Sequence, residues 1–245
     1  MDKVYIAVLA VLCILQIFTV KSFLKAEIPS PNKKSLFRKM ICSAIFIAVA
    51  VICMLFSGNY SKYAILMMLG LIFGLLGDLF LHIVSKEVYF VIGLLSFAVA
   101  HILYVSAYSV AMNEYFPDNP FFSLSDLILY IIIIFSGICF MHYSGQHLGR
   151  AFPFIIFYTC VIGVMIVKAA TLSIYIFGYG GNSPLPPVAG IVLLAGALLF
   201  AFSDGTLSLL LFKKGIEKHG ALRYANIYSY FYGQMLLAMT ILFIK

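Results

Sequence analysis

Two stretches decide the fold of this chain: Gly70-Leu-Ile-Phe-Gly-Leu-Leu-Gly-Asp78-Leu-Phe-Leu81 and Gly196-Ala-Leu-Leu-Phe-Ala-Phe-Ser-Asp204-Gly-Thr-Leu207. Each stretch is almost wholly apolar, and each contains one aspartate. A carboxylate near the middle of a bilayer costs roughly 2.5–3.5 kcal/mol, so such a residue faces a protein interior or a water-filled cavity. Asp78 and Asp204 therefore predict membrane helices that share one polar site.

The composition points to the same class of protein. Of the 245 residues, 64% are hydrophobic and 10% are charged, and the mean hydropathy is +1.09, which is far too apolar for a soluble domain of this length. Apolar runs of about 20 residues match helices that cross a bilayer, and the short alternating strands of an outer-membrane barrel are not seen. We therefore expect an all-α, polytopic transmembrane bundle that forms one domain over residues 1–245.

Charged residues, prolines and glycines bound the apolar runs and predict eight helices. Their expected ranges are about 4–24, 39–57, 62–83, 88–110, 125–143, 152–174, 188–212 and 223–244.

The formal net charge of +7 comes from residues near helix ends, where it sets topology. The odd-numbered loops carry Lys21, Lys25, Lys33, Lys34, Arg38, Lys39, Lys86, Arg150, Lys213, Lys214, Lys218 and Arg223. These loops are predicted to be cytoplasmic, with both termini on the opposite side of the cell (inner) membrane, and no nucleic-acid partner is needed to explain the charge. The five cysteines lie inside predicted spans without paired spacing, so we interpret them as packing residues.

One spacing of small and polar residues occurs three times. The copies are Gly70, Gly74, Gly77, Asp78, Leu81; Gly93, Phe97, Ala100, His101, Tyr104; and Gly196, Phe200, Ser203, Asp204, Leu207. In a helix the members of each copy lie on one stripe, where small residues leave room beside the ionisable group. Gly-x-x-x-Gly spacings are common in membrane helices, but each of these copies reaches an intramembrane Asp or His, which favours function.

These motifs, together with Tyr158 and the sequence Tyr232-Gly-Gln234, resemble the YhhN-like lysoplasmalogenase family of eight-helix membrane proteins. The resemblance covers the third to the eighth predicted helix and is weak in the first two. The first copy of the repeat departs from the other two at Gly74, where they have Phe97 and Phe200. It implies hydrolysis of the vinyl-ether bond of lysoplasmalogen to a fatty aldehyde and a glycerophospho-ethanolamine or -choline, without a cofactor.

Vinyl-ether hydrolysis suits a pair of carboxyl groups. A protonated carboxyl donates to the outer alkenyl carbon, and a carboxylate stabilises the resulting cation and takes a proton from water. Asp78 and Asp204 are the candidate pair and could share one proton. The candidate supporting or substrate-binding residues are His101, Tyr104, Tyr158, Ser203, Tyr232 and Gln234. A lone membrane His or Tyr is often only a packing residue.

Two other functions remain open at this point. Paired intramembrane carboxylates also serve proton-coupled transporters. A metal-dependent membrane lipid hydrolase would use Asp78, His82, His101 and Asp204 as ligands, because His82 follows Asp78 by one turn.

A lysolipid substrate would meet two kinds of residue. Its phosphate would be attracted by the basic residues Lys213, Lys214, Lys218 and Arg223, while its single chain would enter an apolar tunnel lined by Phe97 and Phe200.

Overall fold

The computed structural model describes residues 3–27, 31–83, 87–120, 122–178, 183–216 and 220–245. Its eight α-helices are α1 Lys3–Glu27, α2 Lys33–Ser57, α3 Lys62–His82, α4 Glu87–Tyr115, α5 Leu124–Tyr143, α6 Phe152–Gly178, α7 Pro187–Phe212 and α8 Gly220–Met239. Within the described ranges no strand is present. Of these helices, α1 to α7 are long and apolar enough to cross a membrane. The predicted all-α membrane bundle is confirmed.

The start of α2 differs from the prediction. The helix begins at Lys33 and not near residue 39, because Asn32 caps it. The Asn32 side chain accepts a hydrogen bond from the Ser35 backbone N–H, and the Ser35 hydroxyl accepts one from the Asn32 backbone. This capping box satisfies two N–H groups that the first turn leaves free. As a result Lys39, predicted to lie where the first loop meets the helix, is more than one turn inside the helix and is buried.

Other helix ends also shift. The first helix extends to Glu27, and α4 extends to Tyr115. The last helix begins earlier than predicted and ends at Met239, where a 3₁₀ turn, Thr240–Leu242, follows.

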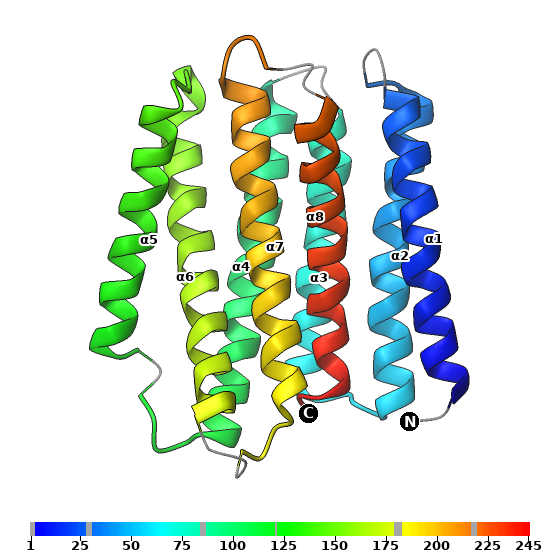
Figure 1. The fold of residues 1–245 in the computed structure, drawn as a ribbon, viewed down its shortest axis with the longest axis vertical. Coiled ribbons are helices and arrows are strands. Elements are labelled where there is room, and N and C mark those ends of the chain that lie inside the picture. Colours follow the sequence, from blue (N-terminus) through cyan, green and yellow to red (C-terminus); the bar gives the residue numbers. More distant parts are fainter. Residues whose placement is uncertain (1–2, 28–30, 84–86, 121, 179–182, 217–219) are drawn as a thin grey trace.

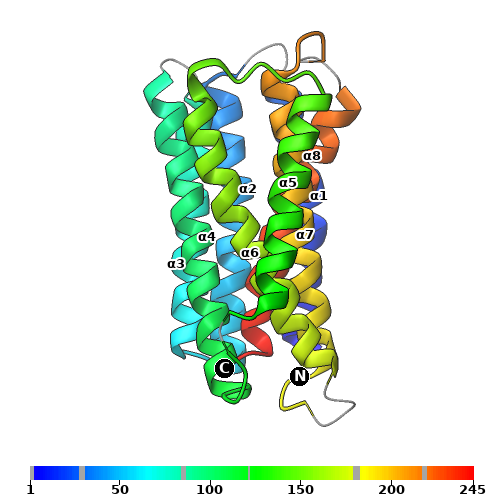
Figure 2. The same ribbon diagram turned by 90° about the vertical axis from the view of Figure 1, so that its left-hand side faces the viewer.

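The helices run side by side along the length of the molecule, and both chain ends lie at the same end of the bundle (Figures 1 and 2). The most extensive pairings join α3 with α4 and α7 with α8. Helix α1 packs mainly on α2, and α5 packs on α6. We call the opposite end, where α3 and α7 finish and α4 and α8 begin, the active-site end.

The repeated small residues let side chains reach across helices. A Cβ at Gly70 would lie 2.3 Å from the Tyr104 ring, and one at Gly77 would lie 2.6 Å from the Phe97 ring. At Gly74, the departure from the repeat, a Cβ would lie 2.7 Å from Nε2 of Gln234. The glycine at this position therefore makes room for a polar side chain from α8.

Candidate active site

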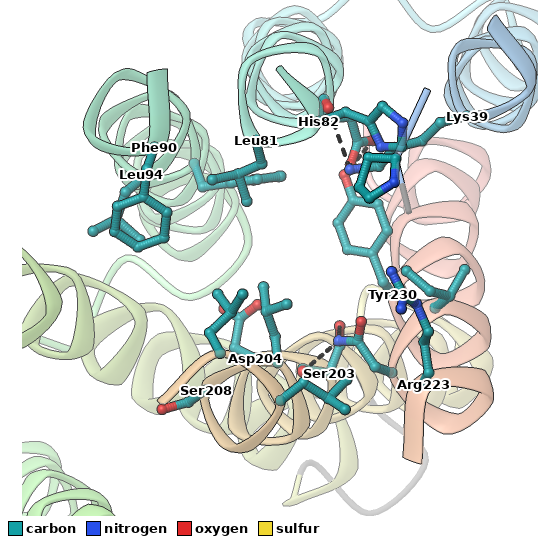
Figure 3. A pocket seen from close by; sticks show the side chains of 18 of the residues that line it. Lys39, Leu81, His82, Phe90, Leu94, Ser203, Asp204, Ser208, Arg223 and Tyr230 are labelled. Carbon is teal, nitrogen blue, oxygen red and sulfur yellow. Dashed lines mark hydrogen bonds and ion pairs between the residues drawn. The ribbon is translucent and has the colours of Figure 1, made fainter. Parts of the chain in front are cut away.

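A cavity of ≈ 480 Å³ lies at the active-site end of the bundle. It is lined from α1, α2, α3, α4, α6, α7 and α8, so segments from most of the chain meet there. Figure 3 shows Asp204 and Ser203 across the open space from Lys39 and Tyr230. Asp78 also lines this cavity, so both predicted aspartates are brought to it.

Asp78 is 2% exposed and is surrounded by hydrogen-bond donors. Nζ of Lys39 lies 3.1 Å from its Oδ1. The hydroxyls of Ser43 and Tyr230 donate to its Oδ2 at 2.7 and 2.8 Å. A buried carboxylate needs such a cation and such donors, and here it has both. The surroundings of Asp78 therefore suit its ionised form.

Asp204 has different surroundings. The Tyr158 hydroxyl donates to its Oδ2, and Nε2 of the buried His101 lies 2.9 Å from the Tyr158 oxygen. In the described part of the chain, no Lys or Arg forms an ion pair with Asp204. The two carboxyl groups thus differ in kind: one is paired with a cation and the other with a phenol.

No hydrogen bond joins the two carboxyl groups in the part of the chain that the structure describes. They lie in one cavity, each with its own partners. Whether the two carboxyl groups share one proton stays a prediction, and any proton passing between them has to cross the cavity.

A chain of hydrogen bonds leads from Asp78 toward the interior of the bundle. The Tyr104 hydroxyl donates to Oε1 of Gln234 at 2.7 Å. Nε2 of Gln234 donates to the Tyr230 oxygen at 3.4 Å, and Tyr230 donates to Asp78. Tyr104 and Gln234 therefore support Asp78 through Tyr230 and do not line the cavity themselves.

Tyr232 is not brought to the site. Its hydroxyl donates to the backbone oxygen of Cys13 in α1 at 2.8 Å, and its ring stacks on Tyr228. Residues two apart in a helix point to nearly opposite faces, so Tyr232 points away from the side of α8 on which Gln234 contacts Tyr230. Ser203 does line the cavity, and its side-chain oxygen accepts a hydrogen bond from Asn226 at 3.0 Å.

The suggested metal ligands do not come together. Nε2 of His82 lies 2.8 Å from the Ser35 oxygen, and its Nδ1 lies 3.8 Å from Glu27. His101 instead contacts Tyr158. Among the residues that the structure describes, no three His, Cys, Asp or Glu side chains form a group that could hold a metal ion. The ligand set Asp78, His82, His101 and Asp204 is therefore not supported by the geometry.

Charged side chains line the cavity near the active-site end. Arg223 contacts Glu27 through Nη2 at 2.8 Å and through Nε at 3.0 Å, both to Oε2. Of the basic residues expected to attract a phosphate, Arg223 lines the cavity, Lys213 and Lys214 follow α7 outside it, and Lys218 lies outside the described residues.

Aromatic rings close the deep side of the cavity. Phe97 and Phe200 pack edge to face with centroids 6.2 Å apart, and each also packs against Tyr230. Phe200 is fully buried and does not line the cavity. Phe97 and Phe200, which we expected to line an apolar tunnel, therefore pack together as an aromatic floor, and of the two only Phe97 lines the cavity.

Sequence reasoning missed Lys39, Ser43 and Tyr230, which all contact Asp78. Two spacings could have indicated them. Lys39 and Ser43 are four residues apart, as are Tyr230 and Gln234, so each pair occupies one helix face. Since only three-dimensional proximity shows that these faces meet Asp78, the spacings alone would not have assigned a role.

Together these groups provide a carboxylate fixed by a cation, a second carboxyl bonded to a tyrosine, and a space between them bordered by apolar walls and a charged rim. Such an arrangement can donate a proton to one atom of a bound molecule and stabilise positive charge on a neighbouring atom.

Comparison with known proteins identifies the family. The family model described as the YhhN family matches residues 35–241, from α2 to the end of α8. Lysoplasmalogenase TMEM86A of Bos taurus is 32% identical over 172 residues, which are 70% of this chain and 62% of that protein. The match thus spans less than two thirds of that relative's length, and no solved structure matches significantly. Because the family model covers most of its length and all of the cavity lining except Phe23, Glu27 and Pro31, this chain is a multi-pass membrane protein that belongs to the YhhN family.

Proposed function

We propose that this protein is a lysoplasmalogenase, an enzyme that hydrolyses the vinyl-ether bond of single-chain ether lipids. The observation that carries the proposal is the pair of unlike aspartates facing one cavity: Asp78 beside Lys39, and Asp204 beside Tyr158. The 32% identity to a bovine lysoplasmalogenase supports the choice of substrate.

In this proposal Asp204 is the general acid. Among the described residues no cation forms an ion pair with its buried carboxyl group, so this group is held in the ionised form less strongly than Asp78 and is the better proton donor of the pair. The proton goes to the outer alkenyl carbon and leaves an oxocarbenium ion at the carbon bonded to the ether oxygen. His101, bonded to Tyr158, holds the phenol in place and acts as a positioning residue.

Asp78 is the carboxylate that faces this cation. A carboxylate has about four lone-pair sites, and Asp78 uses three of them for Lys39, Ser43 and Tyr230. The remaining site can accept a proton from the attacking water. The hemiacetal then breaks its C–O bond to give the aldehyde and the glycerol hydroxyl, and return of the proton to Asp204 through cavity water restores the starting state.

The rim residues suit the headgroup. Arg223 lines the cavity, and its guanidinium group can form two hydrogen bonds with a phosphate. Glu27 beside it carries the opposite charge. A glycerophospho-ethanolamine or -choline carries both charges, so its phosphate can pair with Arg223 while its ammonium pairs with Glu27.

A transporter remains the alternative from another class, but one observation favours the enzyme. Helices α3 and α7, which carry the two aspartates, run unbroken past them. Secondary transporters usually build their binding sites from helices that are broken near the middle of the membrane.

Purified protein in detergent tests the proposal. Lysoplasmalogen should yield fatty aldehyde, with or without a chelator, and Asp78→Asn and Asp204→Asn should each lower kcat by about 10²–10⁴-fold. Asp118→Asn, which changes an exposed aspartate at the other end of the bundle, is the matched control and should retain full activity. Full activity in either cavity variant would refute the paired-aspartate mechanism, and absence of aldehyde from the wild-type protein would refute the function.

A further inference from the structure

A second, smaller cavity lies on the other side of Asp204. Its volume is ≈ 180 Å³, and it lies between α5, α6 and α7. Most of its lining is apolar or glycine, and we define the α5–α7 groove by six of these residues: Ile133, Gly137, Ile162, Ile166, Ala201 and Gly205. Asp204 and Tyr158 line both cavities, so the groove meets the main cavity at the proposed acid.

The groove lies beneath α5, most of whose side chains are not buried. Along α5, Asp126 and Met141 are the buried residues among those described, and Ile131, Ile132 and Phe135 are more than half exposed. Helix α5 packs on α6 at the edge of the bundle (Figure 1). The exposed side chains of α5 face the lipid chains of a membrane, so the groove lies close to the hydrocarbon region.

We propose that the α5–α7 groove binds the alkenyl chain of the lysolipid substrate, an inference that rests on the proposed vinyl-ether hydrolysis. The polar half of the molecule would occupy the main cavity near Arg223. The reacting outer carbon would lie at Asp204, and the chain continues from that carbon. The aromatic floor blocks the deep side of the main cavity, while the groove begins at Asp204 and offers an apolar path.

Two glycines keep the groove open. A Cβ at Gly205 would have no heavy atom within 4 Å, and one at Gly137 would meet Cγ2 of Thr159 at 3.5 Å, an ordinary contact. A large side chain at either position would therefore occupy the groove rather than press on a neighbouring backbone. The two positions lie on different helices, so they test the groove independently.

The experiment measures kcat/KM for a long-chain and a short-chain lysoplasmalogen with Gly205→Phe, Gly137→Leu and the control Gly178→Phe. The long-chain to short-chain ratio should fall about tenfold or more in both groove variants, because each displaces several methylenes from an apolar site. Gly178 ends α6 at the other end of the bundle, also has no heavy atom within 4 Å of its Cβ position, and its variant should keep the wild-type ratio. An unchanged ratio in the groove variants would overturn the proposal.

A second measurement does not depend on turnover. A single-chain lysolipid with a photoreactive group at the end of its chain should label α5 and α7 residues of the groove in the wild-type protein. Labelling of Phe90 or Leu94, on the α4 side of the main cavity, would overturn the groove. If no vinyl ether is cleaved but the groove is labelled, then the proposed function fails and the groove remains the binding site of the lipid chain. If cleavage occurs and labelling lies elsewhere, then only the proposed role of the groove fails.

Discussion

Replacing Lys39 by Met should destabilise the protein and reduce its activity together. The Lys39 side chain is 10% exposed and that of Asp78 is 2% exposed, so little solvent screens the pair across its 3.1 Å separation. Lys39 also donates to the backbone oxygen of Asp78 at 3.2 Å. Removal of one partner of a buried pair leaves an uncompensated charge and costs about 3–5 kcal/mol.

For a chain of this size, that cost corresponds to a fall of roughly 6–20 °C in the unfolding midpoint, at about 2–4 °C per kcal/mol. The chain has no tryptophan, but Cys42 and Cys53 are buried and free, so a thiol-reactive dye can follow unfolding in detergent. Lys34→Met is the matched control, because Lys34 lies in the same helix and is exposed. It should change neither the midpoint nor the rate of aldehyde release.

The double variant Lys39→Met/Asp78→Asn completes the test. It removes both charges, so it should recover much of the stability lost by either single variant while activity stays low. If Lys39→Met melts and turns over substrate like wild type, or if the single effects simply add in the double variant, then the ion pair does not hold Asp78 in its working state.

Two other predictions follow from single contacts. Tyr230→Phe should lower kcat/KM by about 10–100-fold, because it removes a hydrogen bond to Asp78 that is worth about 1.5–3 kcal/mol. The control Tyr232→Phe should release aldehyde near the wild-type rate, because among the described residues the Tyr232 hydroxyl contacts only the α1 backbone. Lys168→Met should lower the unfolding midpoint in the dye assay but not kcat per folded molecule, because Lys168 is fully buried 3.2 Å from Asp126 and neither residue lines the main cavity; a loss of kcat without loss of stability would contradict this.

The length of the bounded apolar runs was enough to predict the helices. Every predicted range corresponds to one observed helix, and seven of these, α1 to α7, are long and apolar enough to cross a bilayer. The ends were less predictable, because local capping decides them. The capping box of Asn32 and Ser35 starts α2 at Lys33, so lysines whose charge predicted a loop lie in the helix. Because the predicted helix began too late, the sequence did not indicate that Lys39 pairs with Asp78.

The part of the site that could be predicted is the part that depends on the spacing of residues within one helix. The repeat correctly brought Asp78 and Asp204 to one cavity. It could not separate Tyr230 from Tyr232, because which face of α8 turns inward depends on how α8 packs against α2 and α7. Nor could it find the pair Asp126 and Lys168, whose members lie 42 residues apart and meet only when α5 packs on α6. The side of the membrane on which the active-site end lies stays a prediction from loop charge.

The hydrogen-bond chain from Tyr104 through Gln234 and Tyr230 to Asp78 has a consequence for the energy of the membrane itself. A row of hydroxyls reaching from a carboxylate into a bilayer would resemble a proton wire, which would dissipate an ion gradient. The amide of Gln234 interrupts that row, because an amide passes on a hydrogen bond but holds its own N–H protons. The row thus supplies Asp78 with a fixed dipole but no path along which a proton could pass from Asp78 to Tyr104.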